Sequence, residues 1–292
     1  MSAVAGASTV PAARAMTDTP TPTDSDPQAP ARADPAVSAA SASSAAPIEL
    51  RPLGWTAPLR WIGRGWKDFL RCPAIGVFYG ACFMVMGWAI LEVYRQAPAY
   101  TLALCAGFLL MGPYLCLGLY RASQRLEQGQ RPDFGDSLLA WDTRPGQLAI
   151  FGFVLLVLEM LWGRATLVIF AVSFDGMPDF KGSLLALLNV RENLGFIVAW
   201  VGVGAVFAGL IFAVSVISIP MILHRQTDAV TAGLTSLRLV LTQTGVMLLW
   251  GALVTVLVVV AMLPAFAGLL VVGPVLGHAS WHAYREAVAD AP

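Results

Sequence analysis

Two pairs of residues in this chain have types and spacings that could support chemistry. Glu159 and Arg164 lie well inside a long apolar block, where an ionisable group is costly and normally faces protein or water. Residues five apart on an ideal helix point about 140° away from each other, so these two side chains are poorly placed to pair. They predict either a proton or ion relay or polar contacts with another helix, for example at Ser215 or Ser218, with Arg164 reaching toward the membrane surface. We favour the structural interpretation.

His278 and His282 form the second pair. They are one helical turn apart, which suits two ligands to one metal ion or, with a ligand from a facing helix, a haem. No neighbouring carboxylate or thiolate in the sequence completes such a set, and His224 is the only other histidine. We therefore favour interfacial histidines that form hydrogen bonds near Trp281 and Tyr284, with metal or haem ligation as the alternative.

Motifs of the common enzyme classes are missing from the sequence. It contains no P-loop, Gly-x-Ser-x-Gly elbow, His-Glu-x-x-His or Cys-x-x-Cys. A formal net charge of +0 gives no general attraction to nucleic acid. We expect a protein that is not an enzyme, with no catalytic residue, no metal and no cofactor. Its four cysteines are interpreted as small apolar residues: Cys72, Cys82, Cys105 and Cys116.

The composition is that of a membrane protein. Hydrophobic residues make up 57% of the chain and charged residues 12%, with a mean hydropathy of +0.70. The apolar residues fall in blocks near the ~20 residues that a spanning helix needs. The expected fold class is all-α, a polytopic membrane helical bundle. Six spans are predicted, at 74–94, 99–120, 148–173, 194–223, 245–263 and 265–283.

The last two predicted spans share one long apolar run at residues 245–277. Pro264 lies near its midpoint, where a sharp turn between two helices is expected. A single long, kinked helix is the alternative. It would leave five spans and place the C-terminus on the opposite side of the membrane.

Cationic side chains are divided unevenly between the two sides of the six-span arrangement. Cytoplasmic loops carry an excess of Lys and Arg, so both termini are predicted in the cytoplasm, with the protein in a bacterial inner membrane. The outer loops carry only Arg95, Lys181 and Arg191. The cytoplasmic flanks carry twelve cations: Arg51, Arg60, Arg64, Lys67, Arg71, Arg121, Arg125, Arg131, Arg144, Arg225, Arg238 and Arg285.

A polar tail and an amphipathic helix precede the first span. Residues 1–50 are rich in Ala, Pro, Ser and Thr, cannot bury enough apolar surface to fold, and predict a disordered cytoplasmic tail before a membrane domain at 51–288. From Trp55 to Arg71, an apolar and a basic stripe are typical of a helix lying against anionic headgroups. The apolar stripe comprises Leu59, Ile62, Trp66, Phe69 and Leu70, and the basic face comprises Arg60, Arg64, Lys67 and Arg71.

Two later segments are similar to this amphipathic helix and suggest an internal repeat. Residues 228–244 and the shorter 134–141 each precede an apolar span. The predicted unit is an interfacial helix followed by a transmembrane hairpin, in three copies. Small residues spaced four apart, as in Gly76-x-x-x-Gly80 and Gly273-x-x-x-Gly277, predict close helix packing.

Three stretches of the sequence carry a family resemblance. They are Gly-Pro-Val-Leu-Gly-His-Ala-Ser-Trp-His-Ala-Tyr-Arg at 273–285, the Gly112-Pro113-Tyr114 exit with the segment from Tyr120 to Glu127, and Leu161-Trp162-Gly163-Arg164-Ala165. Over about residues 50–288 the chain resembles a bacterial family of unknown function. Its members are inner-membrane proteins, some of them labelled as cytochrome c oxidase subunits. The resemblance implies a polytopic inner-membrane protein and carries over no catalytic residue.

Three functional hypotheses follow. We favour a non-enzymatic scaffold or accessory component of a membrane complex, with the lipid bilayer, its anionic headgroups and other membrane proteins as partners. The alternative is a transporter or channel that uses Glu159 and Arg164, because helices broken by Gly and Pro can form sites at the membrane midplane. The third is a haem or metal redox protein that uses His278 and His282.

Overall fold

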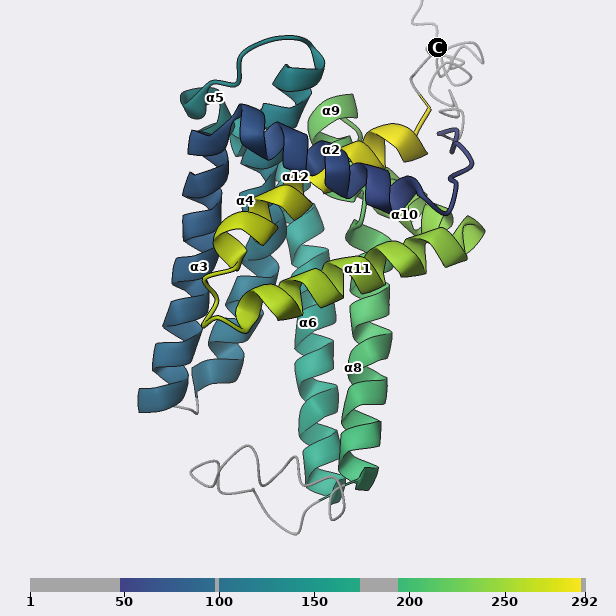
Figure 1. Ribbon diagram of the computed structural model, residues 1–292. Coiled ribbons are helices and arrows are strands. Elements are labelled where there is room, and N and C mark those ends of the chain that lie inside the picture. Colours follow the sequence, from purple (N-terminus) through teal and green to yellow (C-terminus); the bar gives the residue numbers. More distant parts are fainter. Residues whose placement is uncertain (1–47, 98–99, 174–193, 290–292) are drawn as a thin grey trace, which may run out of the picture. The chain divides into compact units, whose positions relative to one another are not determined.

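The structure, a computed structural model, describes residues 48–97, 100–173 and 194–289. Predictions for residues 1–47, Lys181 and Arg191 lie outside these ranges. Within them the chain is helical, apart from turns and one isolated antiparallel bridge between Leu50 and Val288, so the all-α class is confirmed. The helices in Figure 1 are α2 (Ala57–Arg71), α3 (Pro73–Gln96), α4 (Thr101–Glu127), α5 (Phe134–Leu138), the 3-10 helix η2 (Ala140–Thr143), α6 (Pro145–Ser173), α8 (Leu194–Ser215), α9 (Ser218–Arg225), α10 (Ala229–Thr242), α11 (Thr244–Met262) and α12 (Leu269–Ala287).

Local sequence signals set several helix ends. Pro73 begins α3 and thereby ends α2, because the residue before a proline avoids helical geometry. Gly129, with φ of 71°, follows the end of α4 in a left-handed conformation that suits glycine. Asp228 caps α10 by accepting a hydrogen bond from the Thr231 backbone N–H at 2.9 Å.

Five described helices are long and apolar enough to cross a membrane, so a helical membrane bundle is confirmed. The prediction of six spans is not confirmed, because α12 does not meet these criteria. More than half of the residues of α12 are buried, including polar side chains in its C-terminal half. A helix surrounded by protein does not need the apolar surface that lipid demands. The five candidates are Pro73–Gln96, Ala103–Glu127, Pro145–Ser173, Leu194–Arg225 and Thr244–Met262.

Helix α12 packs antiparallel to α3 through glycines on both helices. A Cβ atom at Gly80 would lie 2.0 Å from the Leu270 carbonyl oxygen, and one at Gly273 would lie 2.7 Å from the Phe83 ring. Only the absence of these side chains allows the two backbones to approach so closely. The small-residue motifs therefore pack helices, as predicted.

The apolar run at residues 245–277 forms two helices joined by a turn, as predicted, instead of one kinked helix. Ala265 and Phe266 take left-handed φ values of 49° and 66° in this turn, which is unusual for residues other than glycine. The Trp88 indole donates a hydrogen bond to the Ala265 carbonyl at 2.6 Å. Helix α3 then continues from Trp88 to Gln96, about 12 Å further. The turn of the α11–α12 hairpin therefore lies about 12 Å before the C-terminal end of α3.

The two ends of the helical unit lie side by side. The Arg51 N–H donates to the Ala287 carbonyl at 2.8 Å, and the Ala289 N–H donates to the Glu49 carbonyl at 3.0 Å. The unit thus begins at Ile48, slightly before the predicted boundary at residue 51. The two ends of the unit are therefore neighbours in space. That both lie on the cytoplasmic side of a membrane stays a prediction.

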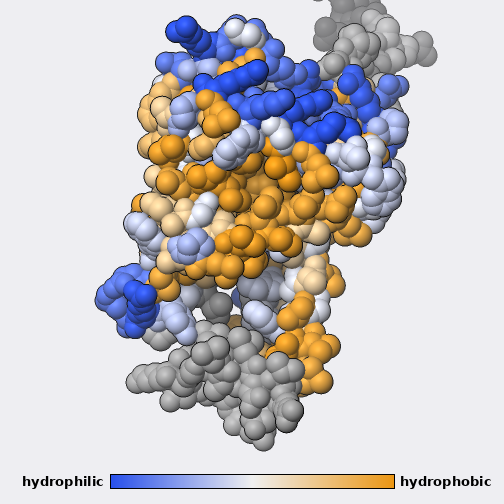
Figure 2. Space-filling model, viewed as in Figure 1, coloured by the Kyte–Doolittle hydropathy of each residue, from blue (hydrophilic) through white to orange (hydrophobic). Residues whose placement is uncertain are grey.

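Several arginines predicted for one side of the membrane gather at this end of the helical unit. Arg225 donates to the Ala289 carbonyl, Arg238 donates to the Ile48 carbonyl at 3.4 Å, and Arg285 pairs with Glu127. Figure 2 shows hydrophilic side chains over α2 and hydrophobic ones over α11. The arrangement fits helices in contact with a lipid bilayer below a polar surface.

Helix α2 has three faces, one more than its sequence suggested. Besides the apolar and basic stripes, a narrow face of small and aromatic residues with one carboxylate packs against the bundle. Phe69 of the predicted apolar stripe is also buried, whereas most of the stripe stays exposed and suits contact with lipid. The packing face comprises Ala57, Trp61, Gly65 and Asp68, and the exposed apolar residues are Leu59, Trp66 and Leu70.

Helices α6 and α8 form a separate antiparallel pair (Figure 1). The Phe170 and Phe196 rings lie 4.8 Å apart, and the Trp162 indole lies near Gly204. The element order follows the predicted unit of a helix followed by a hairpin. The three hairpins pack differently, however, because α12 packs on α2 and α3 while α6 and α8 pack mainly on each other. The threefold repeat is therefore not confirmed.

Gly80→Ala tests the contact between α3 and α12. The added methyl group meets backbone that cannot move aside, so the variant should lose about 1–3 kcal/mol of stability, measured by thermal unfolding of the purified protein in detergent. Gly107→Ala in α4 is the matched control, since no atom lies within 4 Å of its Cβ position. Equal stability of the two variants would contradict the packing described.

Cysteine labelling tests the depth of the α11–α12 turn. In a variant with the four native cysteines replaced, Ala97→Cys at the end of α3 should react with a membrane-impermeant maleimide added on the side of the membrane where α3 ends. Pro264→Cys should stay unlabelled, because the turn lies about 12 Å short of that end. Equal labelling of both positions would show instead that α11 and α12 cross the membrane fully.

Candidate functional site

The candidate site forms where α2 crosses the C-terminal half of α12. A Cβ atom at Gly65 would lie 2.5 Å from the Val275 carbonyl oxygen and 2.8 Å from the Ala279 nitrogen, so the backbones of these helices nearly touch. One helical turn earlier, Trp61 packs edge-to-face on Trp250 with ring centroids 5.4 Å apart. This crossing brings polar side chains of α2 onto α12.

A buried polar network joins α2, α4 and α12 at the crossing. One oxygen of the Asp68 carboxylate, Oδ2, accepts hydrogen bonds from Ser123 Oγ at 2.9 Å and from His282 Nε2 at 2.8 Å. His278 Nδ1 lies 2.7 Å from Ser123 Oγ. Asp68 is 5% exposed, and Ser123 and His278 are 0% exposed. Such burial is tolerated because each polar group has a partner.

The number of protons sets the direction of each hydrogen bond. Ser123 has one hydroxyl proton, which it donates to Asp68. His278 must therefore donate from Nδ1 into Ser123 Oγ, which leaves its Nε2 as an acceptor 3.9 Å from Cys72 Sγ. The chain of donors runs from His278 through Ser123 to Asp68, and His282 donates to the same carboxylate from the other side.

This arrangement is not that of a nucleophilic triad. In such a triad the histidine accepts the serine proton and the serine contacts substrate, whereas here His278 donates to a Ser123 that is fully buried. Burial and the negative charge of Asp68 also raise the pKa of Cys72 to about 11, so its thiol stays protonated at neutral pH. The network is suited to holding three helices together.

The ionisation of Asp68 stabilises the network. Burial by itself would raise the pKa of this carboxyl group, but the hydrogen bond and charge of His282, together with the Ser123 hydrogen bond, lower it below its ordinary value of 3.8. Asp68 is therefore a carboxylate at neutral pH, as an acceptor of two hydrogen bonds must be.

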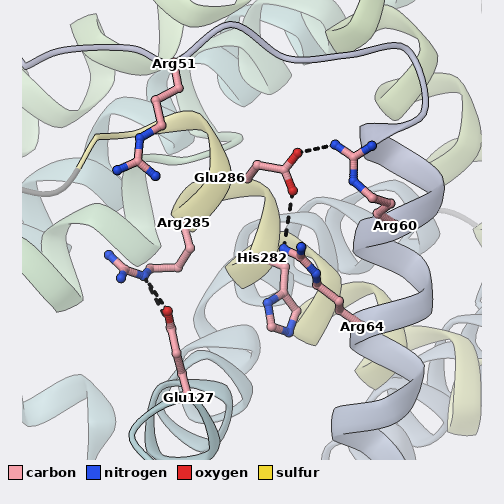
Figure 3. A pocket seen from close by; sticks show the side chains of 7 residues that line it. All are labelled: Arg51, Arg60, Arg64, Glu127, His282, Arg285 and Glu286. Carbon is pink, nitrogen blue, oxygen red and sulfur yellow. Dashed lines mark hydrogen bonds and ion pairs between the residues drawn. The ribbon is translucent and has the colours of Figure 1, made fainter.

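An open cavity of about 440 Å³ adjoins the network on its polar side. His282 belongs to both, because it contacts Asp68 and also lines the cavity. Figure 3 shows charged side chains from the segment before α2, from α2 itself, from the end of α4 and from α12 around this space. The lining residues are Arg51, Arg60, Arg64, Glu127, His282, Arg285 and Glu286.

Two glutamates cross-link the helices around the cavity. Glu286 of α12 accepts from Arg60 Nη2 at 2.5 Å and from Arg64 Nη1 at 3.3 Å, both on α2. Glu127 at the end of α4 accepts from Arg285 Nε at 3.0 Å.

Two indoles help to fix these carboxylates. Trp61 Nε1 donates to Glu286 at 3.2 Å, and Trp281 Nε1 donates to Glu127 at 3.0 Å. On the α2 side of the cavity, two arginines, Arg60 and Arg64, share the one carboxylate of Glu286, so positive charge exceeds negative charge there.

The sequence suggested hydrogen-bonded histidines at 278 and 282 but did not identify their partners, Ser123 and Asp68. The histidine that contacts Tyr284 and Trp281 is His224, with Nδ1 2.8 Å from the Tyr284 hydroxyl and its ring 5.5 Å from that of Trp281. Across the described ranges, no group of three or more His, Cys, Asp or Glu side chains is placed to hold a metal ion. Metal or haem ligation by His278 and His282 stays a prediction.

Glu159 and Arg164 lie far from this site, on α6. Glu159 is buried and Arg164 is exposed, in line with their expected angular separation. Ser218, one of the partners suggested for Glu159, has its hydroxyl within hydrogen-bond distance of the Val214 and Ala232 carbonyls. Glu159 Oε1 is buried and has no hydrogen-bond partner among the described residues.

The predicted basic face of α2 divides into two parts. Arg60 and Arg64 line the cavity, whereas Lys67 and Arg71 do not. Sequence reasoning missed the acidic partners and the serine: Asp68, Ser123, Glu127 and Glu286. For Asp68 a signal exists, since a lone carboxylate on a helix with four cations also shares a face with Trp61 and Gly65. For Ser123, Glu127 and Glu286 the sequence gives no such signal, because their partners are distant in sequence.

Asp68→Asn should destabilise the protein by about 1.5–3 kcal/mol at neutral pH, the scale of hydrogen bonds to a charged group. A carboxyl group whose pKa is lowered on folding contributes stability above its unfolded pKa and loses it as the pH falls through the folded pKa. The difference from the wild type should therefore shrink as the pH falls below 3.8, measured by thermal unfolding between about pH 3 and 7. Asp142→Asn, at an exposed position, is the control. A difference equally large at both pH extremes would contradict the role of Asp68.

Comparison with known families tests the resemblance seen in the sequence. No curated protein and no solved structure matches the chain. The matching stretch begins at the first residue of α4 and ends within α9, so the terminal stretch at 273–285 lies outside it. The resemblance to a membrane family of unknown function is confirmed over that part: residues 101–224 match the family described as "Predicted integral membrane protein (DUF2189)".

Proposed function

We propose that this integral membrane protein is a non-enzymatic scaffold or accessory component that assembles with other membrane proteins through the α6–α8 hairpin. The observation that carries the proposal is Arg164, a charged side chain exposed on the largely apolar helix α6. The same hairpin also contains buried polar atoms that have no hydrogen-bond partner in the described part of the chain. They are Glu159 Oε1, Thr166 Oγ1 and Trp200 Nε1. An unsatisfied polar group away from water costs several kcal/mol, so an arrangement that supplies partners is favoured.

The position of these atoms supports a shared role. The ring contact between Phe170 and Phe196 and the approach of Trp162 to Gly204 set the antiparallel register of the hairpin. In this register Thr166 lies opposite Trp200. Polar side chains that form hydrogen bonds between helices are a usual source of association in membranes.

The outer surface of the hairpin also supports assembly. In the most apolar stretch of α6, 17% of the residues are buried. The corresponding share is 44% in the span Leu194–Arg225. Arg164 is exposed on this largely apolar helix, where a charged side chain facing lipid is costly. A neighbouring membrane protein with a carboxylate or carbonyl groups would relieve that cost. Large apolar side chains exposed on α6 include Phe153, Met160, Leu161 and Val168.

A transporter or channel is the second candidate, because water in a pathway would also satisfy Glu159. The cavity described above does not involve Glu159 or Arg164. A haem or metal redox function, the third hypothesis, would require His278 and His282 to exchange their contacts with Ser123 and Asp68 for a metal.

Native electrophoresis in mild detergent tests the assembly. The wild type should migrate as a particle larger than the monomer, and Arg164→Gln should shift a large share of it to monomer size. Arg95→Gln is the matched control, because Arg95 is also exposed on a membrane helix but lies at its end beside Glu92. Purely monomeric wild type in membranes solubilised from several growth conditions would contradict the proposal.

A second measurement separates assembly from transport. Glu159→Cys, in a background without native cysteines, should resist a hydrophilic thiol reagent if protein surrounds this position. Rapid labelling from the aqueous phase, together with solute or proton flux in proteoliposomes that Glu159→Gln abolishes, would establish transport instead.

A further inference from the structure

We infer that the cavity at the α2–α12 crossing binds a phosphate group, carried either by a phospholipid headgroup or by a soluble phosphate compound. This inference is independent of the proposed assembly through α6 and α8, because it concerns the opposite part of the helical unit and other residues.

The charge of the cavity wall favours an anion. Arg60 and Arg64 share the single carboxylate of Glu286, so two positive charges meet one negative charge where α2 lines the cavity. A phosphate group carries one to two negative charges at neutral pH. The positive charge of this wall therefore suits a phosphate group.

The guanidinium groups suit a phosphate in geometry. A guanidinium has five N–H donors in a planar fork that can engage two oxygens at once. The contacts to Glu286 use one nitrogen each of Arg60 and Arg64, Nη2 and Nη1 respectively. The side chains of these arginines are 45% and 50% exposed, so an incoming anion can reach them without unfolding the helix crossing.

The glutamates hold the arginines in place before a ligand arrives. Glu286 fixes both arginines of α2 and receives the Trp61 indole N–H, while Glu127 fixes Arg285 and receives the Trp281 N–H. The cationic side chains are thus preorganised, which lowers the entropy cost of binding. A bound phosphate competes with Glu286 for Arg60 and Arg64.

The surroundings place the cavity at the level of lipid headgroups. Leu59, Trp66 and Leu70 are exposed on the neighbouring face of α2 and suit the boundary between headgroups and acyl chains. A phospholipid could therefore place its phosphate in the cavity and its chains along α2. A soluble phosphate compound could enter from the polar side, since the cavity is open.

Titration of the purified full-length protein in uncharged detergent tests the inference, with tryptophan fluorescence as the readout because Trp61 and Trp281 contact the cavity glutamates. Short-chain phosphatidylglycerol and inorganic phosphate are the two ligand probes. Phosphatidylcholine and chloride at equal ionic strength are the references. A response to phosphatidylglycerol alone assigns a lipid headgroup, a response to inorganic phosphate assigns a soluble ligand, and no saturable response to either probe overturns the inference.

Variants distinguish a defined site from general attraction to anions. The double variant R60Q/R64Q should weaken binding at least about tenfold. The matched double variant K67Q/R71Q removes the same charge from the same basic face outside the cavity, and it should change binding less than about twofold. Equal weakening by both would show diffuse electrostatic attraction and overturn the site.

Glu286→Gln guards against loss of binding through misfolding. It removes the carboxylate that competes for Arg60 and Arg64, while the amide oxygen can still accept the Trp61 N–H. Binding should become several-fold tighter, on the scale of one ion pair. Weaker binding by this variant, with the protein still folded by circular dichroism, would contradict the competition described.

Discussion

Close approach of backbones around α12 is the constraint on which the rest of the structure depends. Between helices in a membrane, association relies on van der Waals packing and hydrogen bonds, because lipid competes equally for apolar surface. Glycines make this packing close: Gly65 of α2 lies against Val275, and Gly80 of α3 lies against Leu270. At these distances Asp68 can be buried, because the helices that cover it also supply its donors.

The polar groups around α12 and those on the α6–α8 hairpin are satisfied to different extents. Around α12, Asp68, Ser123, His278 and His282 share hydrogen bonds, and Glu127 and Glu286 pair with arginines. On α6 and α8, Glu159, Thr166 and Trp200 each keep a buried polar atom without a partner in the described ranges. This contrast separates a self-sufficient region with a cationic cavity from a region that supports a role in assembly.

Much of the fold followed from periodicity and hydropathy. The apolar blocks located the five candidate spans, the spacing in α2 located its apolar and basic stripes, and Pro264 located the turn between α11 and α12. The sixth span is not confirmed, because an apolar run identifies a helix in an apolar environment but does not separate burial in protein from exposure to lipid. The depth of the α11–α12 turn depends on Trp88 and Ala265, residues far apart in the sequence.

The sequence by itself determined a polytopic helical membrane protein, because helix periodicity and transfer to lipid are local properties of each segment. Only the tertiary structure decided which polar residues meet. The partners of Asp68 lie on α4 and α12, and Glu286 reaches back to α2. Such contacts depend on helix register and crossing, which hydropathy does not encode. For this reason the sequence indicated that His278 and His282 form hydrogen bonds, but only the structure shows that Ser123 of α4 and Asp68 of α2 are their partners.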